Sequence, residues 1–339
     1  MRTFVNNCHK YFHIGPVEEK WGFYVNTAGY TKINPNSHYP LNKEHPQNHS
    51  FNWDKGRILS SYYLVFICKG QGVFESAYTD LTQINEGTCF FLYPGVWHRY
   101  KPNSGTGWEE YWIGFNGAYP NDLMHKGFFT ADDPCIYVGL NSDLLNLFQK
   151  LIETIRFSSS GYNQIIAGIA LQILGVVNSI SIHKGQENDP IGILISKAKF
   201  LLQESLDKSV DMEILAKNLP MGYSAFRKAF KEKVGVSPNQ YHLNLRLNRA
   251  KNLLSTTTLR ISEVAYLSGF DSLFYFSKLF KNKNGQSPKS YRKRNILCIA
   301  VLLTFFITTF YFLFHQSFHI SIEDNIHYAI RIGPNNPIG

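Results

Sequence analysis

The carboxyl-terminal half of this chain repeats one pattern of residues about fifty positions apart, and this repeat limits the possible folds more than any other feature. Phe-Lys at 230–231 precedes Gly-Val-Ser-Pro at 235–238, and Phe-Lys at 280–281 precedes Gly-Gln-Ser-Pro at 285–288. Apolar residues at helical spacing lie before each copy, on either side of a break that contains glycine. One structural unit built twice explains this arrangement. Residues 211–294 are therefore predicted to form two helix-turn-helix units in tandem.

The same pattern predicts where the helices of the two units lie. In the first unit, a Leu-Pro-Met-Gly turn at 219–222 precedes a helix over 223–234. In the second unit, Gly269 supplies the turn before a helix over 272–284. A single helix over 238–254 connects the units and would be about 26 Å long at 1.5 Å per residue. Such a spacer could hold the second helix of each unit roughly one DNA turn apart, on the order of 34 Å.

The charge of the chain is concentrated in this module. Residues 192–294 hold 19 lysines and arginines against 7 acidic residues, a net charge of +12, so the rest of the chain carries −3 of the overall +9. A cationic module indicates a polyphosphate partner. Lysines alone would also fit a solvated helix face, but the tandem units favour double-stranded DNA. Arg246 on the connecting helix either contacts DNA or serves the fold. The predicted phosphate contacts are Lys281, Lys283, Lys289 and Arg292.

Side chains opposite the apolar stripe of each second helix are the candidates for contact with bases. Phe226 and Phe230 lie on one stripe of the first such helix, which predicts that they face the core, and Phe276 and Phe280 repeat this spacing. The first turns of a recognition helix enter the major groove, where Leu273 could contact a thymine methyl group. The predicted DNA-binding residues are Ser224, Ala225, Arg227, Lys228, Arg246, Ser272, Leu273, Tyr275, Lys278, Lys281 and Lys283.

The module resembles the DNA-binding domain of the AraC/XylS family of bacterial transcription regulators. The resemblance covers 191–294 and is carried by Gly-Phe-Asp-Ser at 269–272, Tyr-Phe-Ser-Lys-Leu-Phe-Lys at 275–281 and Gly-Gln-Ser-Pro-Lys-Ser-Tyr-Arg at 285–292. It implies binding to promoter DNA. The chain differs from the family at one position: the family usually has serine at the start of the first recognition helix, where this chain has Gly222. This departure leaves the N-cap of that helix in question.

The amino-terminal part of the sequence has a different pattern of apolar and polar residues. Between residues 55 and 117, short alternating or apolar runs are separated by turn signals, which indicates many short strands in a small barrel or sandwich. Gly-Gln-Gly at 70–72 is predicted to be a hairpin turn. This part resembles the cupin-like effector domain of the same family, and an effector-binding domain over 1–140 is expected. The matching segments are 64–72, 93–100 and 112–115.

The resemblance also implies a ligand pocket inside the barrel. Its residue types suit a polyol, because an indole face stacks on sugar C–H groups while guanidinium, carboxylate and phenol groups bind hydroxyls. The alternative is a barrel core, since 15% of the residues are aromatic. A small-molecule effector is the broad hypothesis and a sugar the narrower one. The residues that match the pocket motifs are Arg57, His98, Tyr100, Glu110 and Trp112.

Nothing in the sequence predicts catalysis, a metal or a cofactor. Metal-binding barrels need clustered histidines, whereas His98 stands alone and no His-X-His occurs in residues 1–120. The sequence also lacks a Walker loop, a dinucleotide glycine motif and a nucleophile elbow. Five scattered cysteines without Cys-X-X-Cys spacing fit a reduced cytosol. We therefore expect a cytoplasmic protein that is not an enzyme.

Two apolar helices are predicted in segment 141–182, over 142–155 and 163–182. Helices placed here in the family form dimers, which implies a homodimer, but packing within one chain explains them equally well. The polar, glycine-containing segment 183–190 is predicted to be a flexible linker.

The tail over 295–339 is anomalous for the family. Residues 296–314 carry no charge and follow a basic cluster, so they are long enough to span a bilayer with the DNA module on the cytoplasmic side. A membrane anchor, a segment packed on protein and a non-native extension all fit this composition.

The sequence thus predicts a multidomain α+β chain with a cupin-like β-barrel, dimerising helices, an all-α tandem helix-turn-helix domain and a hydrophobic tail. The predicted function is a ligand-responsive, sequence-specific transcription regulator, with activation favoured by the resemblance. The alternative is a membrane-tethered sensory or interaction protein whose basic module contacts polyanions without sequence specificity.

Overall fold

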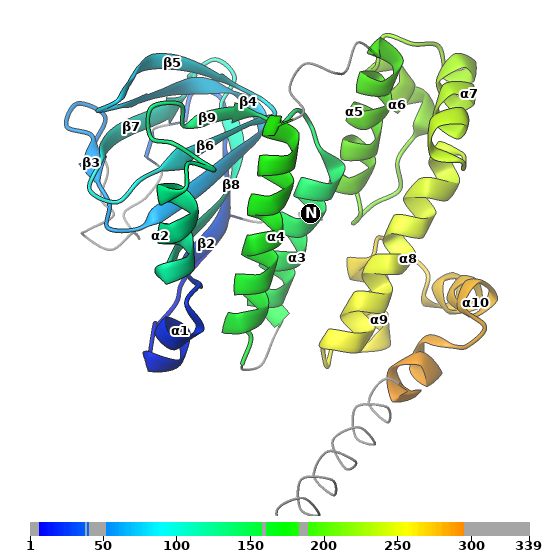
Figure 1. Cartoon of the computed structure of the whole chain (residues 1–339). Coiled ribbons are helices and arrows are strands. Elements are labelled where there is room, and N and C mark those ends of the chain that lie inside the picture. The colour runs from blue at the N-terminus through cyan, green and yellow to red at the C-terminus, as the bar shows by residue number, and fades with distance from the viewer. Residues whose placement is uncertain (1–6, 38, 41–51, 158–160, 183–188, 295–339) are drawn as a thin grey trace, which may run out of the picture.

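The computed structural model describes residues 7–37, 39–40, 52–157, 161–182 and 189–294. A β-sheet domain and a domain built of helices lie side by side, with two long helices between the sheet and the helical domain (Figure 1). The predicted α+β organisation is confirmed. The hydrophobic tail over 295–339 and residues 183–188 of the predicted linker lie outside the described residues.

The amino-terminal domain is an antiparallel barrel in two parts that share one long strand, β4 (Tyr62–Ser76). The larger part has the strand order β1-β2-β8-β4-β6-β9, and in the smaller part β4 pairs with β5 and β7, and β7 with β3. The other strands are β1 (Cys8–Tyr11), β2 (Tyr24–Ile33), β3 (Arg57–Ile58), β5 (Thr79–Asn85), β6 (Thr88–Leu92), β7 (Trp97–Pro102), β8 (Trp108–Asn116) and β9 (Cys135–Tyr137).

The hairpin turn predicted at 70–72 is wrong, because β4 continues through it. The strand pairs with β8 up to Gly70 and with β7 from Gly72 onward, so these residues mark where it passes from one part of the barrel to the other. Gly70 has a φ of +83°, and a Cβ atom there would lie 2.2 Å from the carbonyl oxygen of Gly107. Glycine is therefore needed for close approach of two strands rather than for chain reversal.

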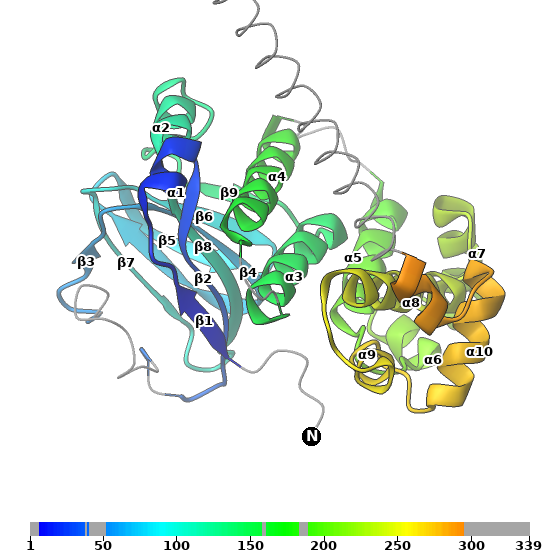
Figure 2. The ribbon, with the colours of Figure 1, turned by 90° about the horizontal axis from the view of Figure 1, so that it is seen from below.

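Side chains of the central strands alternate between two cores. On β8, Trp108 and Trp112 belong to the core inside the barrel. Tyr111, Ile113 and Phe115 belong to a second core on the outer face of the sheet. Two helices cover that outer face, α3 (Ser142–Phe157) and α4 (Asn163–Ile182), as Figure 2 shows from below. The short helices α1 (Pro16–Trp21) and α2 (Ala118–His125) lie at the end of the barrel.

Helix α4 is the one described helix that is long and apolar enough to cross a membrane by length and composition. Its Ile166, Ile173 and Val177 are fully buried in the outer core, so in this fold it is a packed core helix. Ile165 and Ile182 remain exposed. The homodimer inferred from the family stays a prediction.

The carboxyl-terminal domain confirms the tandem plan. Its helices are α5 (Pro190–Glu204), α6 (Met212–Lys217), α7 (Tyr223–Val234), α8 (Pro238–Thr256), α9 (Ile261–Leu267) and α10 (Leu273–Asn284). Helix α8 is two residues longer than predicted, about 28 Å at 1.5 Å per residue. It joins two separate small cores, one around Phe226 and Phe230 and the other around Phe276 and Phe280.

Candidate effector pocket and DNA-binding surface

Inside the barrel, Arg57, His98 and Tyr100, three of the residues predicted to contact the effector, form one hydrogen-bonded cluster. Pairing of β3 with β7 sets Arg57 opposite His98. Arg57 donates from Nε to Nε2 of His98 at 3.3 Å and from Nη2 to the Tyr100 hydroxyl at 2.7 Å. Nδ1 of His98 lies 3.1 Å from the carbonyl oxygen of Val96, which fits a donor at that nitrogen. Burial and the charge of Arg57 lower the pKa of His98 to about 4, so the ring is a neutral acceptor.

Glu110 lies on β8 and shares its inner face with Trp108 and Trp112. Its carboxyl group is buried, and Oε2 has no hydrogen-bond partner among the described residues. Burial raises the pKa of Glu110 to about 8, although the charge of Arg57 opposes this shift. A buried polar atom without a partner is costly. Glu110 is therefore a group that a polar ligand could satisfy.

The Trp112 ring occupies space that a side chain at Gly29, on the neighbouring strand β2, would otherwise fill. Gly29 on β2 is its register partner, and a Cβ atom at Gly29 would lie 2.3 Å from the Trp112 ring. The indole ring therefore lies close to the backbone of β2 at Gly29. A side chain at Gly29 would displace it into the barrel.

Sequence reasoning missed Tyr39 and Tyr63. Tyr39 comes from the loop between β2 and β3, and its ring centroid lies 6.5 Å from that of Tyr100 and 6.4 Å from that of Trp108. Tyr63 on β4 belongs to the inner core. Tyr39 lies in a stretch with no periodicity, so no local signal distinguished it. Tyr63 was hidden within a continuous apolar run, which does not reveal the two faces of a strand.

A cavity of about 320 Å³ lies beside the end of β3, where Ile58 and Tyr63 form part of its wall, and none of the five predicted effector-binding residues lines it. Asn26 Oδ1 and Thr27 Oγ1 belong to residues of the same wall, and both atoms are buried without a hydrogen-bond partner among the described residues. Ligand pockets in proteins begin at roughly 300 Å³. The barrel therefore offers both space and unsatisfied polar atoms to a small polar molecule.

Helix α7, which the sequence predicts to be the first recognition helix, exposes the four side chains predicted to contact DNA. Phe226 and Phe230 are fully buried. Its N-cap is Gly222, which makes no side-chain capping bond, so the departure from the family leaves this helix start without that bond. The exposed residues of its first turns are Ser224, Ala225, Arg227 and Lys228.

The second recognition helix, α10, begins with a conventional cap. The Ser272 hydroxyl accepts a hydrogen bond from the backbone N–H of Tyr275 at 3.2 Å. Phe274, which sequence reasoning left out of the site, is 79% exposed. The predicted residues Leu273, Tyr275, Lys278, Lys281, Lys283 and Lys289 are also exposed.

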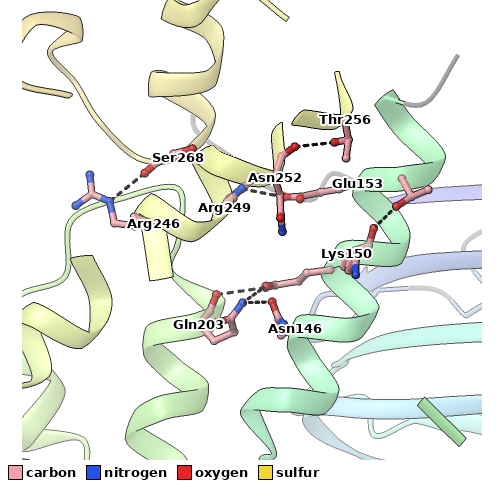
Figure 3. Close-up of polar contacts among 11 residues, drawn as sticks. Asn146, Lys150, Glu153, Gln203, Arg246, Arg249, Asn252, Thr256 and Ser268 are labelled. Carbon is pink, nitrogen blue, oxygen red and sulfur yellow. Dashed lines mark hydrogen bonds and ion pairs between the residues drawn. The ribbon is translucent and has the colours of Figure 1, made fainter. Parts of the chain in front are cut away.

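Arg246 and Arg292 serve the fold. Arg246 donates from Nε to the carbonyl oxygen of Ser268 at 3.0 Å (Figure 3). It also donates from Nη2 to the carbonyl oxygen of Gly269, and its guanidinium carbon lies 4.2 Å from the centroid of Phe270. Arg246 thereby fixes the turn before α10. Of the two roles that the sequence left open for Arg246, contact with DNA or support of the fold, this favours support of the fold. Arg292, predicted to contact phosphate, donates to the carbonyl oxygens of Leu254 and Leu259 at 3.3 and 2.7 Å.

The first helix of the carboxyl-terminal domain packs on the barrel domain. Phe200 on α5 is 2% exposed and belongs to the outer core of the sheet, with its ring centroid 6.4 Å from that of Phe66. Gln203, one turn further, donates to Gln149 Oε1 at 2.8 Å and to Asn146 Oδ1 at 3.2 Å on α3 (Figure 3). The last two residues of the predicted linker belong to α5, because Asp189 caps this helix and Pro190 begins it.

A buried ion pair joins the two domains at the middle of α8. Arg249 Nε lies 2.8 Å from Oε1 of Glu153 on α3, and their side chains are 4% and 16% exposed. Burial raises the pKa of Glu153, and burial lowers the pKa of Arg249 to about 10. The two domains therefore meet through the contact of Phe200 with Phe66, the hydrogen bonds of Gln203 with Asn146 and Gln149, and the ion pair of Arg249 with Glu153. We call these contacts the domain junction.

A barrel with a polar pocket, joined to two helix-turn-helix units through a buried junction, is the architecture of a ligand-responsive DNA-binding protein. Comparison with known families supports both halves. Residues 42–174 match the AraC-like ligand binding domain, and residues 215–294 match a helix-turn-helix domain. The chain belongs to the AraC/XylS family of transcription regulators.

Relatives of known name are regulators of operons. The raffinose operon transcriptional regulatory protein of Pediococcus pentosaceus is 25% identical over 251 residues, which are 72% of this chain and 89% of that protein. The lactose operon transcription activator of Staphylococcus xylosus is 25% identical over 69% of this chain and 85% of its own length. The arabinose operon regulatory protein of Escherichia coli is 23% identical over 70% and 82%. The chain is thus a ligand-responsive transcription regulator.

Proposed function

We propose that this regulator is an activator that binds specific promoter sites and responds to a sugar held in the barrel. The observation that carries the sugar proposal is Oε2 of Glu110, which is buried near the charge of Arg57 and has no hydrogen-bond partner among the described residues. The names of the raffinose, lactose and arabinose operon regulators support the same effector class. Activation is supported by the name of the lactose operon activator.

The pocket residues divide the recognition of a sugar among them. Arg57 and Tyr100 supply directional donors for ring hydroxyls. Glu110, neutral below a pH of about 8, can donate one hydrogen bond and accept another. The indole of Trp112 offers a flat face for sugar C–H groups.

Calorimetric titration of the full chain with a panel of mono- and oligosaccharides tests the effector class. Heat from at least one sugar, lost in Glu110→Gln and in Trp112→Ala, is the expected result. Tyr78→Ala removes an aromatic residue that is 59% exposed and lies outside the pocket, so this control should bind like the unmodified chain. Binding of no sugar, or equal binding by the pocket variants, would remove the sugar proposal.

We further propose that β8 carries the signal out of the pocket. Its inner face bears Glu110 and Trp112, and its outer face bears Tyr111, whose hydroxyl hydrogen-bonds Gln149 of α3. Gln149 in turn accepts a hydrogen bond from Gln203 of α5. A ligand that moves β8 would act on this chain of contacts. Effector binding would then favour one arrangement of the two domains over another.

Sequence-specific binding is tested by selecting genome fragments with the full chain at about 50 and 200 mM salt. Recovery of a motif with two boxes is expected, with specificity at one position relaxed by Arg227→Ala. Binding that is sensitive to salt but recovers no motif would reject the proposal. That result, together with binding to acidic vesicles, would favour the membrane-tethered alternative.

The homodimer is proposed on the exposed apolar residues of α4, Ile165 and Ile182. Sedimentation of the full chain, with Ile165→Glu as the variant, would test it. A chain that stays monomeric at all concentrations would reject it.

A further inference from the structure

The first turn of α10 exposes three consecutive large apolar or aromatic side chains. Leu273 is 46% exposed, Phe274 79% and Tyr275 54%. In the matching turn of α7, Tyr223 is half-buried and the exposed residues are the small Ser224 and Ala225. We call residues 273–275 the apolar turn. Helices α7 and α10 lie at opposite ends of α8, on the side of the molecule away from the barrel (Figure 1).

The fold does not use Phe274. The core of this unit is filled by Phe270, Phe276 and Phe280, which are at most 3% exposed. Tyr275 has a partial structural role, since its ring centroid lies 6.3 Å from that of Phe270. No comparable ring contact within the described residues involves Phe274, and the Ser272 cap fixes the helix start with this side chain directed away from the core. Phe274 forms one contiguous exposed patch with Leu273 and Tyr275, and it is a contiguous apolar patch that points to contact with a partner.

The charge around the apolar turn indicates which partner. Lys278, Lys281 and Lys283 are exposed on the same helix, within a domain of net charge +12. Such a surface attracts the phosphates of duplex DNA. In the major groove, the C5 methyl group of thymine is the apolar feature of the base edges. DNA therefore satisfies both the lysines and the apolar turn.

We propose that Phe274, together with Leu273, contacts thymine methyl groups and gives α10 a preference for a thymine-containing box. This inference rests on the proposed function, and it assigns the two helices different chemistry. Helix α7 presents Arg227, whose guanidinium can bind the O6 and N7 atoms of guanine. Helix α10 recognises apolar methyl groups. The two boxes of one site should therefore differ in base composition.

Removal of single methyl groups from DNA tests the contact directly. The selected duplex is prepared with thymines of the α10 box replaced by uracil, which keeps base pairing and removes only the methyl group. Binding of the full chain should weaken about fourfold for each contacted methyl, the size expected for burial of one such group. Phe274→Ser should bind the thymine duplex more weakly and should not distinguish it from the uracil duplex.

Two controls isolate the effect. Uracil placed in the α7 box should change binding by the full chain much less than uracil in the α10 box. Phe128→Ser alters a side chain that is 50% exposed on the barrel domain, so it should keep the full response to uracil. Because Phe274 is outside the core, the variant is expected to fold, and circular dichroism checks this.

Each outcome separates the inference from the proposed function. A two-box motif whose α10 box is indifferent to uracil would overturn the thymine contact and leave the regulator intact. Recovery of no motif would reject the proposed function itself. A Phe274→Ser variant that binds DNA normally but fails to activate transcription would assign the apolar turn to a protein partner, which also overturns the inference.

Discussion

At the scale of single residues, the most informative group is Glu110. Its Oε2 atom is buried and has no hydrogen-bond partner among the described residues. The protein keeps this group in its neutral form at neutral pH, since burial raises its pKa to about 8. Residues arranged for stability alone are expected to be paired when they are buried. The arrangement is typical of a binding site, where a ligand completes the hydrogen bonds.

Stability should therefore depend on pH through Glu110. Its pKa is higher in the folded chain than the usual 4.5, so the folded state binds more protons and stability falls as pH rises toward 8. His98 and His242 have pKa values lowered from 6.5 to about 4, so they make stability rise with pH, but only below pH 6.5. Between pH 6.5 and 8, Glu110→Gln should flatten the decline, by at most about 1.4 kcal/mol per pH unit. Urea unfolding of both proteins across this range measures the difference, and parallel curves would contradict the assignment.

At the scale of secondary-structure elements, β4 shows how a single strand can serve two parts of a barrel. Gly70 and Gly72 let it pass close to neighbouring strands, since Cβ atoms there would lie 2.2 Å from the Gly107 carbonyl oxygen and 2.3 Å from that of Lys101. The strand thereby connects Tyr63 in the larger part with Phe74 in the smaller part. Both side chains belong to the core inside the barrel.

Gly70→Ala should destabilise the barrel, because it adds both a positive-φ strain and a clash with backbone. The strain alone costs roughly 1 to 3 kcal/mol. Thermal unfolding of the variant should therefore show a lower midpoint for the barrel domain. Gly95→Ala is the matched control, since Gly95 also has a positive φ, +75°, but nothing lies within 4 Å of its added Cβ. Equal effects of the two changes would mean that close approach at Gly70 is unimportant.

Elements with strong periodicity were predictable from the sequence, and contacts between distant elements were not. The bounds 223–234 and 163–182 agree with α7 and α4, because apolar spacing and flanking breaks determine them. The glycines at 70–72 look like a turn locally, and only strands far along the chain reveal their role. The structural role of Arg246 likewise depends on Ser268, which is distant in sequence.

At the scale of the whole molecule, the domain junction makes the sensor and the DNA-binding domain one connected body. Phe200 is buried in the outer core of the barrel domain, and Arg249 pairs with Glu153 from the middle of α8. The side chains of the ion pair thus lie between α8 and α3 (Figure 3). Helix α3 therefore links the sheet to the connecting helix.

Glu153→Gln should weaken this connection. It removes the negative charge beside the buried Arg249, and loss of one partner from a buried pair typically costs about 3 to 5 kcal/mol. Faster hydrogen exchange in α3 and α8 is expected, with DNA binding that responds less to effector. Asp122→Asn breaks the exposed pair with Lys126 and should leave exchange in these helices unchanged. Unaltered exchange and unaltered effector response in Glu153→Gln would contradict a role for the junction.

The straight, uninterrupted α8 has a consequence for the promoter rather than for the protein. Its amino-terminal half packs in one small core and its carboxyl-terminal half in the other, so the two recognition helices cannot slide apart without loss of one core. In the proposed two-box site, base pairs within a box could therefore change gradually during evolution, with some loss of affinity. The number of base pairs between the proposed boxes could not, because an insertion of about five would turn one box to the opposite side of the duplex.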